Sequence, residues 1–99
     1  MSEKGYTYTT LSGGPGEPVR VTVSFYLDDR AWIRVPGIEA GQPVLSIEHG
    51  DVLVRFGPAA GQVTGQDARI ARTLAGQAAI YAAEIERLSA AGGAGADAA

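Results

Sequence analysis

The sequence contains no cysteine, only one histidine and only one lysine, and each scarcity excludes a kind of chemistry. Without cysteine the chain has no disulfide, no thiolate nucleophile and no cysteine-based zinc site, a composition that fits a reducing compartment. No apolar run approaches the roughly 18 residues that cross a bilayer. Residues 1–6 also lack the basic segment and apolar run of a signal peptide. We therefore expect a cytoplasmic protein with no membrane association.

A strong charge of either sign is missing as well. The net charge of −3 is spread evenly, and neither half of the chain is basic, which argues against binding of a long nucleic-acid backbone. The basic residues are almost all arginine, and alanine and glycine are abundant, a bias typical of high-GC bacterial genomes. Ninety-nine residues, 45% of them hydrophobic, suffice for one domain with a modest core, which self-association would help to stabilise.

Alternating apolar and polar residues predict strands in the first sixty residues. The pattern is clearest over residues 19–26, where the period of two is that of a strand with one buried face. A polar break of hairpin length follows at residues 27–30, and Gly50-Asp51 reads as a tight hairpin turn. The prediction is an α+β fold with a four- or five-stranded, mostly antiparallel β-meander. Its strands are residues 6–11, 19–26, 31–35, 44–49 and 52–56.

One long helix is predicted after the strands, over residues 65–89. Thr64 can cap its N-terminus, and Asp67 three residues later places a negative charge at the positive end of the helix dipole. Gly92-Gly93 is expected to end the helix, and residues 91–99 have the composition of a disordered Gly/Ala tail. Residues 1–90 are thus predicted to form a single domain.

Apolar residues at spacings of three and four form one stripe along this helix. We expect the helix to pack on one face of the sheet, with the stripe against the apolar side chains of the strands. The stripe consists of Ala71, Leu74, Ala78, Tyr81, Ile85 and Leu88. The apolar face consists of Val19, Val21, Val23, Phe25, Ile33, Val35, Leu45, Ile47, Val52, Val54 and Phe56.

Small residues beside the stripe indicate self-association, because they permit close approach of another backbone. About 25 helical residues also span roughly 37 Å, whereas strands of five or six residues span about 17–20 Å, so the helix is expected to extend beyond the sheet. The alternative is that alanine is simply a good helix former. We expect a homodimer, the commonest oligomer. The predicted interface residues are Gly76, Ala79, Ile80 and Ala83.

The sequence carries no motif for catalysis or cofactor binding. Alternation sends Glu48 and His49 to opposite faces, so we interpret residues 48–51 as a polar turn rather than a metal site. The adjacent acids Asp28-Asp29 fit a turn better than a catalytic carboxylate pair. The glycine-rich loop at residues 13–16 lacks the lysine and the following helix of a phosphate-binding loop. We expect no enzymatic activity, no cofactor and no metal.

The polar face of the sheet is the candidate binding surface. Exposed aromatic residues interleaved with arginine are typical of protein–protein hot spots and of stacking platforms for single-stranded nucleic acid. The same residues can simply stabilise a solvated sheet through aromatic–arginine pairs. Acidic neighbours argue against nucleic acid. The candidate residues are Arg20, Tyr26, Trp32, Arg34 and Arg55, with Tyr6 or Tyr8 as additions.

The sequence thus predicts a small non-catalytic protein-binding or regulatory module that forms a homodimer and has an unidentified protein partner. Two alternatives stay open. One is a structural or assembly protein whose function is self-association. The other is a small-molecule or nucleic-acid binder that uses the tyrosine, tryptophan and arginine side chains of the polar sheet face.

Overall fold

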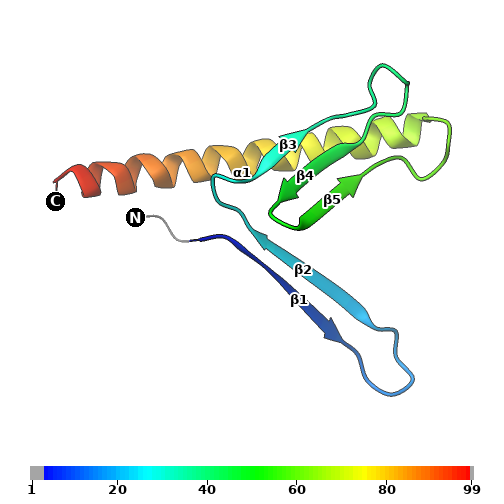
Figure 1. Ribbon diagram of the computed structural model, residues 1–99, viewed down its shortest axis with the longest axis horizontal. Helices are drawn as coiled ribbons and strands as arrows, with labels where there is room; N and C mark the ends of the chain where they lie inside the picture. Colours follow the sequence, from blue (N-terminus) through cyan, green and yellow to red (C-terminus); the bar gives the residue numbers. More distant parts are fainter. Residues whose placement is uncertain (1–3, 99) are drawn as a thin grey trace. The chain divides into compact units, whose positions relative to one another are not determined.

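The computed structural model describes residues 4–98, and the side chains of residues 4–92, as an α+β fold of five strands and one long helix (Figure 1). All strands are antiparallel, and the predicted fold class is confirmed. The chain divides into two compact units, Met1–Gly57 with the strands and Pro58–Ala99 with the helix.

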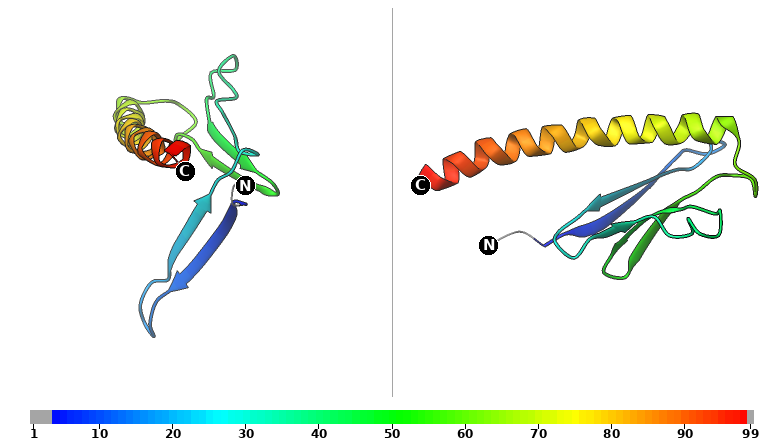
Figure 2. Two further views of the ribbon diagram at one scale, coloured as in Figure 1. Left: turned by 90° about the vertical axis from the view of Figure 1, so that its left-hand side faces the viewer. Right: turned by 90° about the horizontal axis from the view of Figure 1, so that it is seen from above.

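The first sheet is a hairpin of β1 (Tyr6–Ser12) and β2 (Arg20–Tyr26), which Figure 2 shows from two further sides. The strands are in register over seven residue pairs, from Tyr6–Tyr26 to Ser12–Arg20. In the connecting loop the Glu17 N–H donates to the Gly14 carbonyl at 2.9 Å. A two-stranded hairpin is marginally stable by itself, so contacts at its open end matter for its stability.

The second sheet has three strands in the order β3 (Trp32–Arg34), β4 (Leu45–His49) and β5 (Val52–Phe56). The middle strand β4 pairs with both neighbours, and Ile47 lies between Ile33 and Val54 on the apolar face. The predicted turn between β4 and β5 is confirmed. Gly50 takes a φ of 60° there, and glycine with positive φ at the first turn position is the type II′ pattern that suits a two-residue hairpin.

The five strands are divided between two sheets instead of forming one continuous meander. Residues 27–30, predicted as a hairpin break, form a corner at which the Ala31 N–H donates to the Asp28 carbonyl at 3.0 Å. Strand β2 pairs only with β1, and β3 pairs only with β4. At this corner the Asp28 side chain bonds to groups outside β2 and β3, as described below, and β2 and β3 are not paired.

The connection between β3 and β4 is held closed by backbone hydrogen bonds. The Val44 N–H donates to the Pro36 carbonyl at 3.1 Å, and the Gln42 N–H donates to the Gly37 carbonyl at 2.9 Å. Gly37 has a φ of 86°, which side-chain-bearing residues rarely adopt. This closed loop returns the chain to β4 in the register that sets Arg34 opposite Ser46.

Among the described residues no hydrophobic side chain is fully buried. The predicted apolar face is only partly buried. Five of its members are half-buried, namely Phe25, Leu45, Ile47, Val52 and Val54. The other six are exposed, namely Val19, Val21, Val23, Ile33, Val35 and Phe56. The two buried residues are polar: Ser46 is 3% exposed and His49 is 5% exposed. Packing of the helix on the sheet stays a prediction.

The helix α1 (Gly65–Ala98) begins at the predicted residue. The Thr64 N–H donates to the Asp67 carboxylate at 2.8 Å, and the Asp67 N–H donates to the Thr64 hydroxyl at 3.4 Å, which is the reciprocal pattern of a capping box. The C-terminal end was predicted at residue 89, with a disordered tail at 91–99, but the helix has Ala98 as its last residue. Gly92, Gly93 and Gly95 lie within this helix and cost about 1 kcal/mol each relative to alanine, while the alanines beside them are the best helix formers. Residue 99 lies outside the described residues.

Candidate functional site

The three-stranded sheet presents two cross-strand rows of side chains on its polar face. Each row has a β4 residue at its centre, flanked by one residue of β3 and one of β5. Together these side chains are named the Trp–Arg face. One row is Trp32, Glu48 and Leu53, and the other is Arg34, Ser46 and Arg55.

Trp32 and Arg34 are in direct contact on this face. The guanidinium carbon of Arg34 lies 4.4 Å from the centroid of the Trp32 ring. A cation–π contact at an exposed site contributes about 0.5–1 kcal/mol, enough to favour one orientation of the two side chains. Trp32 is 55% exposed and Leu53, in the same row, is 52% exposed. The face therefore offers apolar surface to solvent beside an oriented guanidinium.

The second row places two arginines on either side of a buried serine. Ser46 occupies the middle position, with Arg34 and Arg55 as its partners. Neither arginine forms an ion pair with any described side chain. Two guanidinium groups against the one Glu48 carboxylate give this face a net positive charge on a chain of net charge −3. Because arginine binds carboxylates in a bidentate geometry, this face is suited to an acidic group.

Arg20 and Tyr26, also predicted for this surface, lie in the other sheet at opposite ends of β2. Tyr26 faces Tyr6 across the hairpin, with ring centroids 4.7 Å apart and ring planes at 35°. An aromatic pair of this kind contributes roughly 0.5–1.5 kcal/mol. The structure thus brings three of the five predicted binding residues together, and the other two belong to the hairpin.

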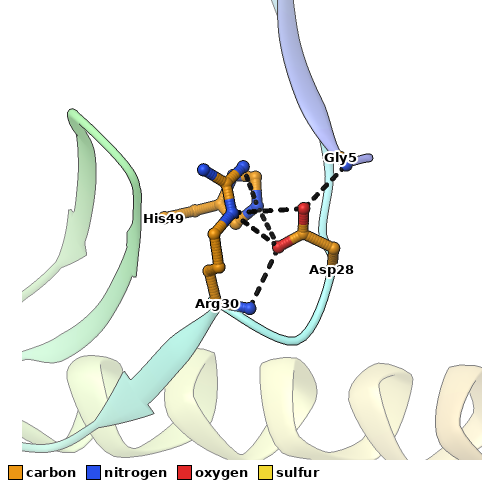
Figure 3. Close-up of polar contacts among 4 residues, drawn as sticks. All are labelled: Gly5, Asp28, Arg30 and His49. Atoms are coloured by element: carbon orange, nitrogen blue, oxygen red, sulfur yellow. Dashed lines mark hydrogen bonds and ion pairs between the residues drawn. The ribbon is translucent and has the colours of Figure 1, made fainter. Parts of the chain in front are cut away.

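A polar cluster joins three segments of the first unit (Figure 3). The Asp28 carboxylate accepts hydrogen bonds from the Gly5 N–H at 2.8 Å and the Arg30 N–H at 3.0 Å. It also lies 3.1 Å from Arg30 Nε and 2.8 Å from His49 Nε2. These four residues are named the Asp28 junction. They tie the start of β1, the corner after β2 and the end of β4 to one carboxylate.

Asp28 and Arg30 form an ion pair within the Asp28 junction. The Arg30 guanidinium and the N–H groups of Gly5 and Arg30 hold the pKa of the Asp28 carboxyl far below its usual range. In return, the Asp28 carboxylate raises the pKa of Arg30. Burial of this side chain, which is only 11% exposed, acts in the opposite direction, but the hydrogen bonds outweigh it. The Asp28 carboxyl therefore stays ionised at neutral pH and well into the acid range.

His49 is the last residue of β4, as predicted, and its side chain is part of this junction. Alternation does place Glu48 and His49 on opposite faces, but the His49 ring is turned toward Asp28, which offers a charged acceptor in place of water. Among the described side chains no hydroxyl is hydrogen-bonded to the ring, so the contact resembles a structural tie more than a nucleophile–base pair. No group of three metal-ligating side chains occurs in the described part of the chain.

The Asp28 junction was not predicted from the sequence, because its members are far apart in the chain. Gly5 lies 23 residues before Asp28, and His49 lies 21 residues after it. The one local signal is an aspartate followed two residues later by arginine at a strand end, which suits a side-chain-capped turn. That signal predicts the Arg30 contact but gives no reason to expect His49.

The predicted dimer residues Gly76, Ala79, Ile80 and Ala83 lie on α1 at helical spacings that place them on one side. Ile80 is exposed and is the single large apolar side chain of this group. Close to it on the helix surface, Glu84 and Arg87 form an ion pair, with Arg87 Nε 3.1 Å from Glu84 Oε1. Self-association through these four residues stays a prediction.

Comparison of the chain with protein-family models, curated proteins and solved structures finds no match. Over residues 4–98, no helical segment combines the length and the hydropathy of a membrane span. The geometry of the Trp–Arg face, the Asp28 junction and α1 is therefore the basis for any functional assignment.

Proposed function

We propose that the protein is a non-catalytic binding module that recognises an acidic segment of a partner protein through the Trp–Arg face. The observation that carries the proposal is the exposed Trp32 ring held against Arg34. Arg55 lies in the same row as Arg34, and neither arginine is ion-paired with a described side chain. Tryptophan and arginine are among the residues most enriched at binding hot spots.

The spacing of the two rows suggests what the partner segment looks like. Neighbouring rows are two residues apart along each strand, or roughly 7 Å. Side chains on the same side of an extended peptide have the same separation. A carboxylate can therefore lie at Arg34 or Arg55 while an apolar side chain two residues away covers Trp32 or Leu53. The partner is an extended segment. On the side that faces the Trp–Arg face, its acidic and apolar residues alternate.

Calorimetric titration with designed peptides tests the proposal. The probe is an extended peptide with glutamate and leucine two residues apart, and its control carries glutamine in place of each glutamate. We expect the acidic peptide to bind more tightly, with an affinity that falls as salt is added. Arg34→Gln and Arg55→Gln should each weaken binding about tenfold. Arg20→Gln, on the other sheet, is the matched control and should change nothing.

Three results would contradict the proposal. Equal affinity for the glutamate and glutamine peptides would show that carboxylates are not recognised. Equal effects of Arg20→Gln and Arg34→Gln would remove the Trp–Arg face from the site. Tighter binding of a single-stranded oligonucleotide, weakened by the same two arginine variants, would assign the face to nucleic acid instead.

The stability of Trp32→Ala is a separate check on the exposed position of Trp32. Because the side chain is more than half exposed, its removal should change the free energy of unfolding by about 1 kcal/mol or less, the value of the lost cation–π contact. Loss of about 3–5 kcal/mol, as for a core aromatic, would mean that Trp32 is buried and not available to a partner.

A further inference from the structure

The apolar stripe of α1 has the spacing of a coiled-coil seam. Its six positions follow one another at intervals of three and four residues, which is the a/d repeat of a heptad. Small and large side chains alternate in its first half, and its four large members are between 41% and 69% exposed. The stripe therefore has the form of a helix-pairing surface. Its members are Ala71, Leu74, Ala78, Tyr81, Ile85 and Leu88.

The stripe is also complementary to the same stripe of a second helix that runs in the opposite direction. Its positions are symmetric about a point between residues 79 and 80. A two-fold axis at that point sets Ala71 against Leu88 of a second copy, Ala78 against Tyr81, and Leu74 against Ile85. Both alanines then face a large side chain, an arrangement that lets facing layers interdigitate, and the Leu74 and Ile85 layer pairs two aliphatic side chains. Parallel pairing would instead set alanine against alanine and tyrosine against tyrosine, leaving gaps beside an overfilled layer.

The residues that flank the stripe favour the same arrangement. On one flank, the antiparallel pairing sets Gln77 of each copy beside Glu84 of the other, an amide donor beside a carboxylate. On the other flank are Ala75 and Ala82, which are small enough for the two backbones to approach closely. No like charges therefore face each other across this central part of the seam.

The distribution of charge along α1 selects the antiparallel orientation. The first part of the stripe region holds Arg69 and Arg72 against Asp67, and the last part holds Glu84 and Glu86 against Arg87. Antiparallel copies place a net positive end beside a net negative end, and their helix dipoles oppose each other favourably. Parallel copies place like ends together.

We infer that α1 pairs with α1 of a second copy of the chain, antiparallel, through this stripe, and that this pairing takes the place of the predicted packing of the stripe on the sheet. The surface differs from the patch of Gly76, Ala79, Ile80 and Ala83, which lies on another side of the helix and has one large apolar residue instead of four. The inference rests on α1 alone and is independent of the Trp–Arg face. It stands even if the acidic-peptide proposal fails.

Sedimentation equilibrium of the full-length chain at micromolar concentration is the first test. The wild type should have twice the mass of one chain. Leu74→Glu and Ile85→Glu should each weaken the dimer by more than about a hundredfold, because a carboxylate would be forced into the seam. Ile80→Glu is the matched control, the same change at an exposed position away from the seam, and should leave the dimer intact.

Cysteine cross-linking tests the orientation without depending on the charged variants. The natural chain has no cysteine, so Leu74→Cys and Ile85→Cys each introduce a single thiol. In the antiparallel pair residue 74 of one copy is roughly 16 Å along the axis from residue 74 of the other, beyond the reach of a disulfide. Each variant alone should stay uncross-linked under mild oxidation, and a mixture of the two should form a covalent dimer.

Several outcomes overturn the inference. If the wild type is a monomer at these concentrations, the inference is wrong. The same holds if the stripe is buried against the strands of its own chain. Dissociation by Ile80→Glu with a stable Leu74→Glu dimer assigns the interface to the Gly76–Ala83 patch. Efficient cross-linking of each cysteine variant by itself indicates parallel helices.

Discussion

Replacing Gly37 with alanine is expected to destabilise the first unit by about 3 kcal/mol. An alanine at the positive φ of Gly37 costs about 1–2 kcal/mol, because its Cβ crowds the following carbonyl. The new Cβ would also lie 2.1 Å from the Gln42 carbonyl oxygen, so that oxygen must move. The movement strains the Gln42 N–H to Gly37 carbonyl hydrogen bond at 2.9 Å, which contributes about 1 kcal/mol.

Urea unfolding followed by the fluorescence of Trp32, the single tryptophan, measures this effect beside the affected loop. Gly41→Ala is the matched control in the same loop. Gly41 has a φ of 72°, but no atom lies within 4 Å of its added Cβ, so only the conformational cost of about 1–2 kcal/mol applies. Equal losses of stability in the two variants would refute the reasoning, because the steric overlap at Gly37 would then have no energetic effect.

Two further predictions concern the cap of α1 and the Asp28 junction. Thr64→Ala should lower the stability of the helix by about 1 kcal/mol in thermal unfolding followed by far-UV circular dichroism. Thr73→Ala, whose hydroxyl donates to the Arg69 carbonyl at 3.0 Å within the helix, should cost nothing. Asp28→Asn should lower the urea midpoint at pH 7, and the control Asp29→Asn should not. The pKa of Asp28 is lowered in the folded state. The contribution of the ionised carboxylate to the free energy of unfolding is therefore complete above about pH 3.9, the pKa of aspartate in the unfolded chain, and is lost as the pH falls further. The wild-type and Asp28→Asn midpoints should therefore converge below about pH 4, and a gap that stays constant down to pH 2 would contradict this assignment.

The elements of the fold were predictable where the information is local. Alternation in residues 52–56 predicts β5 to the residue, and Thr64 with Asp67 fixes the start of α1. Such patterns reflect which side chains can share a strand face or a helix cap, and they operate within a few residues. The same reasoning placed Trp32, Arg34 and Arg55 on one polar face, because their strands pair directly with β4.

The division into two sheets was not predictable in this way. Residues 27–30 have the length and polarity of a hairpin turn, and the local sequence favours pairing of β2 with β3. In the structure Asp28 instead bonds to Gly5 and His49, two partners that are distant in the chain and that no local pattern indicates. The helix end was missed for a different reason. Gly92 and Gly93 end a helix only where a non-helical conformation has the lower free energy. The surrounding alanines have a high helix propensity, and they favour continuation of the helix.

The two-stranded hairpin has a consequence for how the protein behaves on storage. In the described chain β1 and β2 have only each other as neighbours, so each leaves one edge of seven residues without a strand partner. Neither strand contains the lysine or proline that protects natural edges, and Arg20 is their single charge. Strand addition at such an edge has no natural end point, and its products grow with time. A two-fold helix pair is closed and stops at two copies. A specific dimer of this protein should therefore keep its mass as a sample ages, whereas aggregation through the hairpin edges should give products whose mass increases with time. Concentration alone does not separate the two.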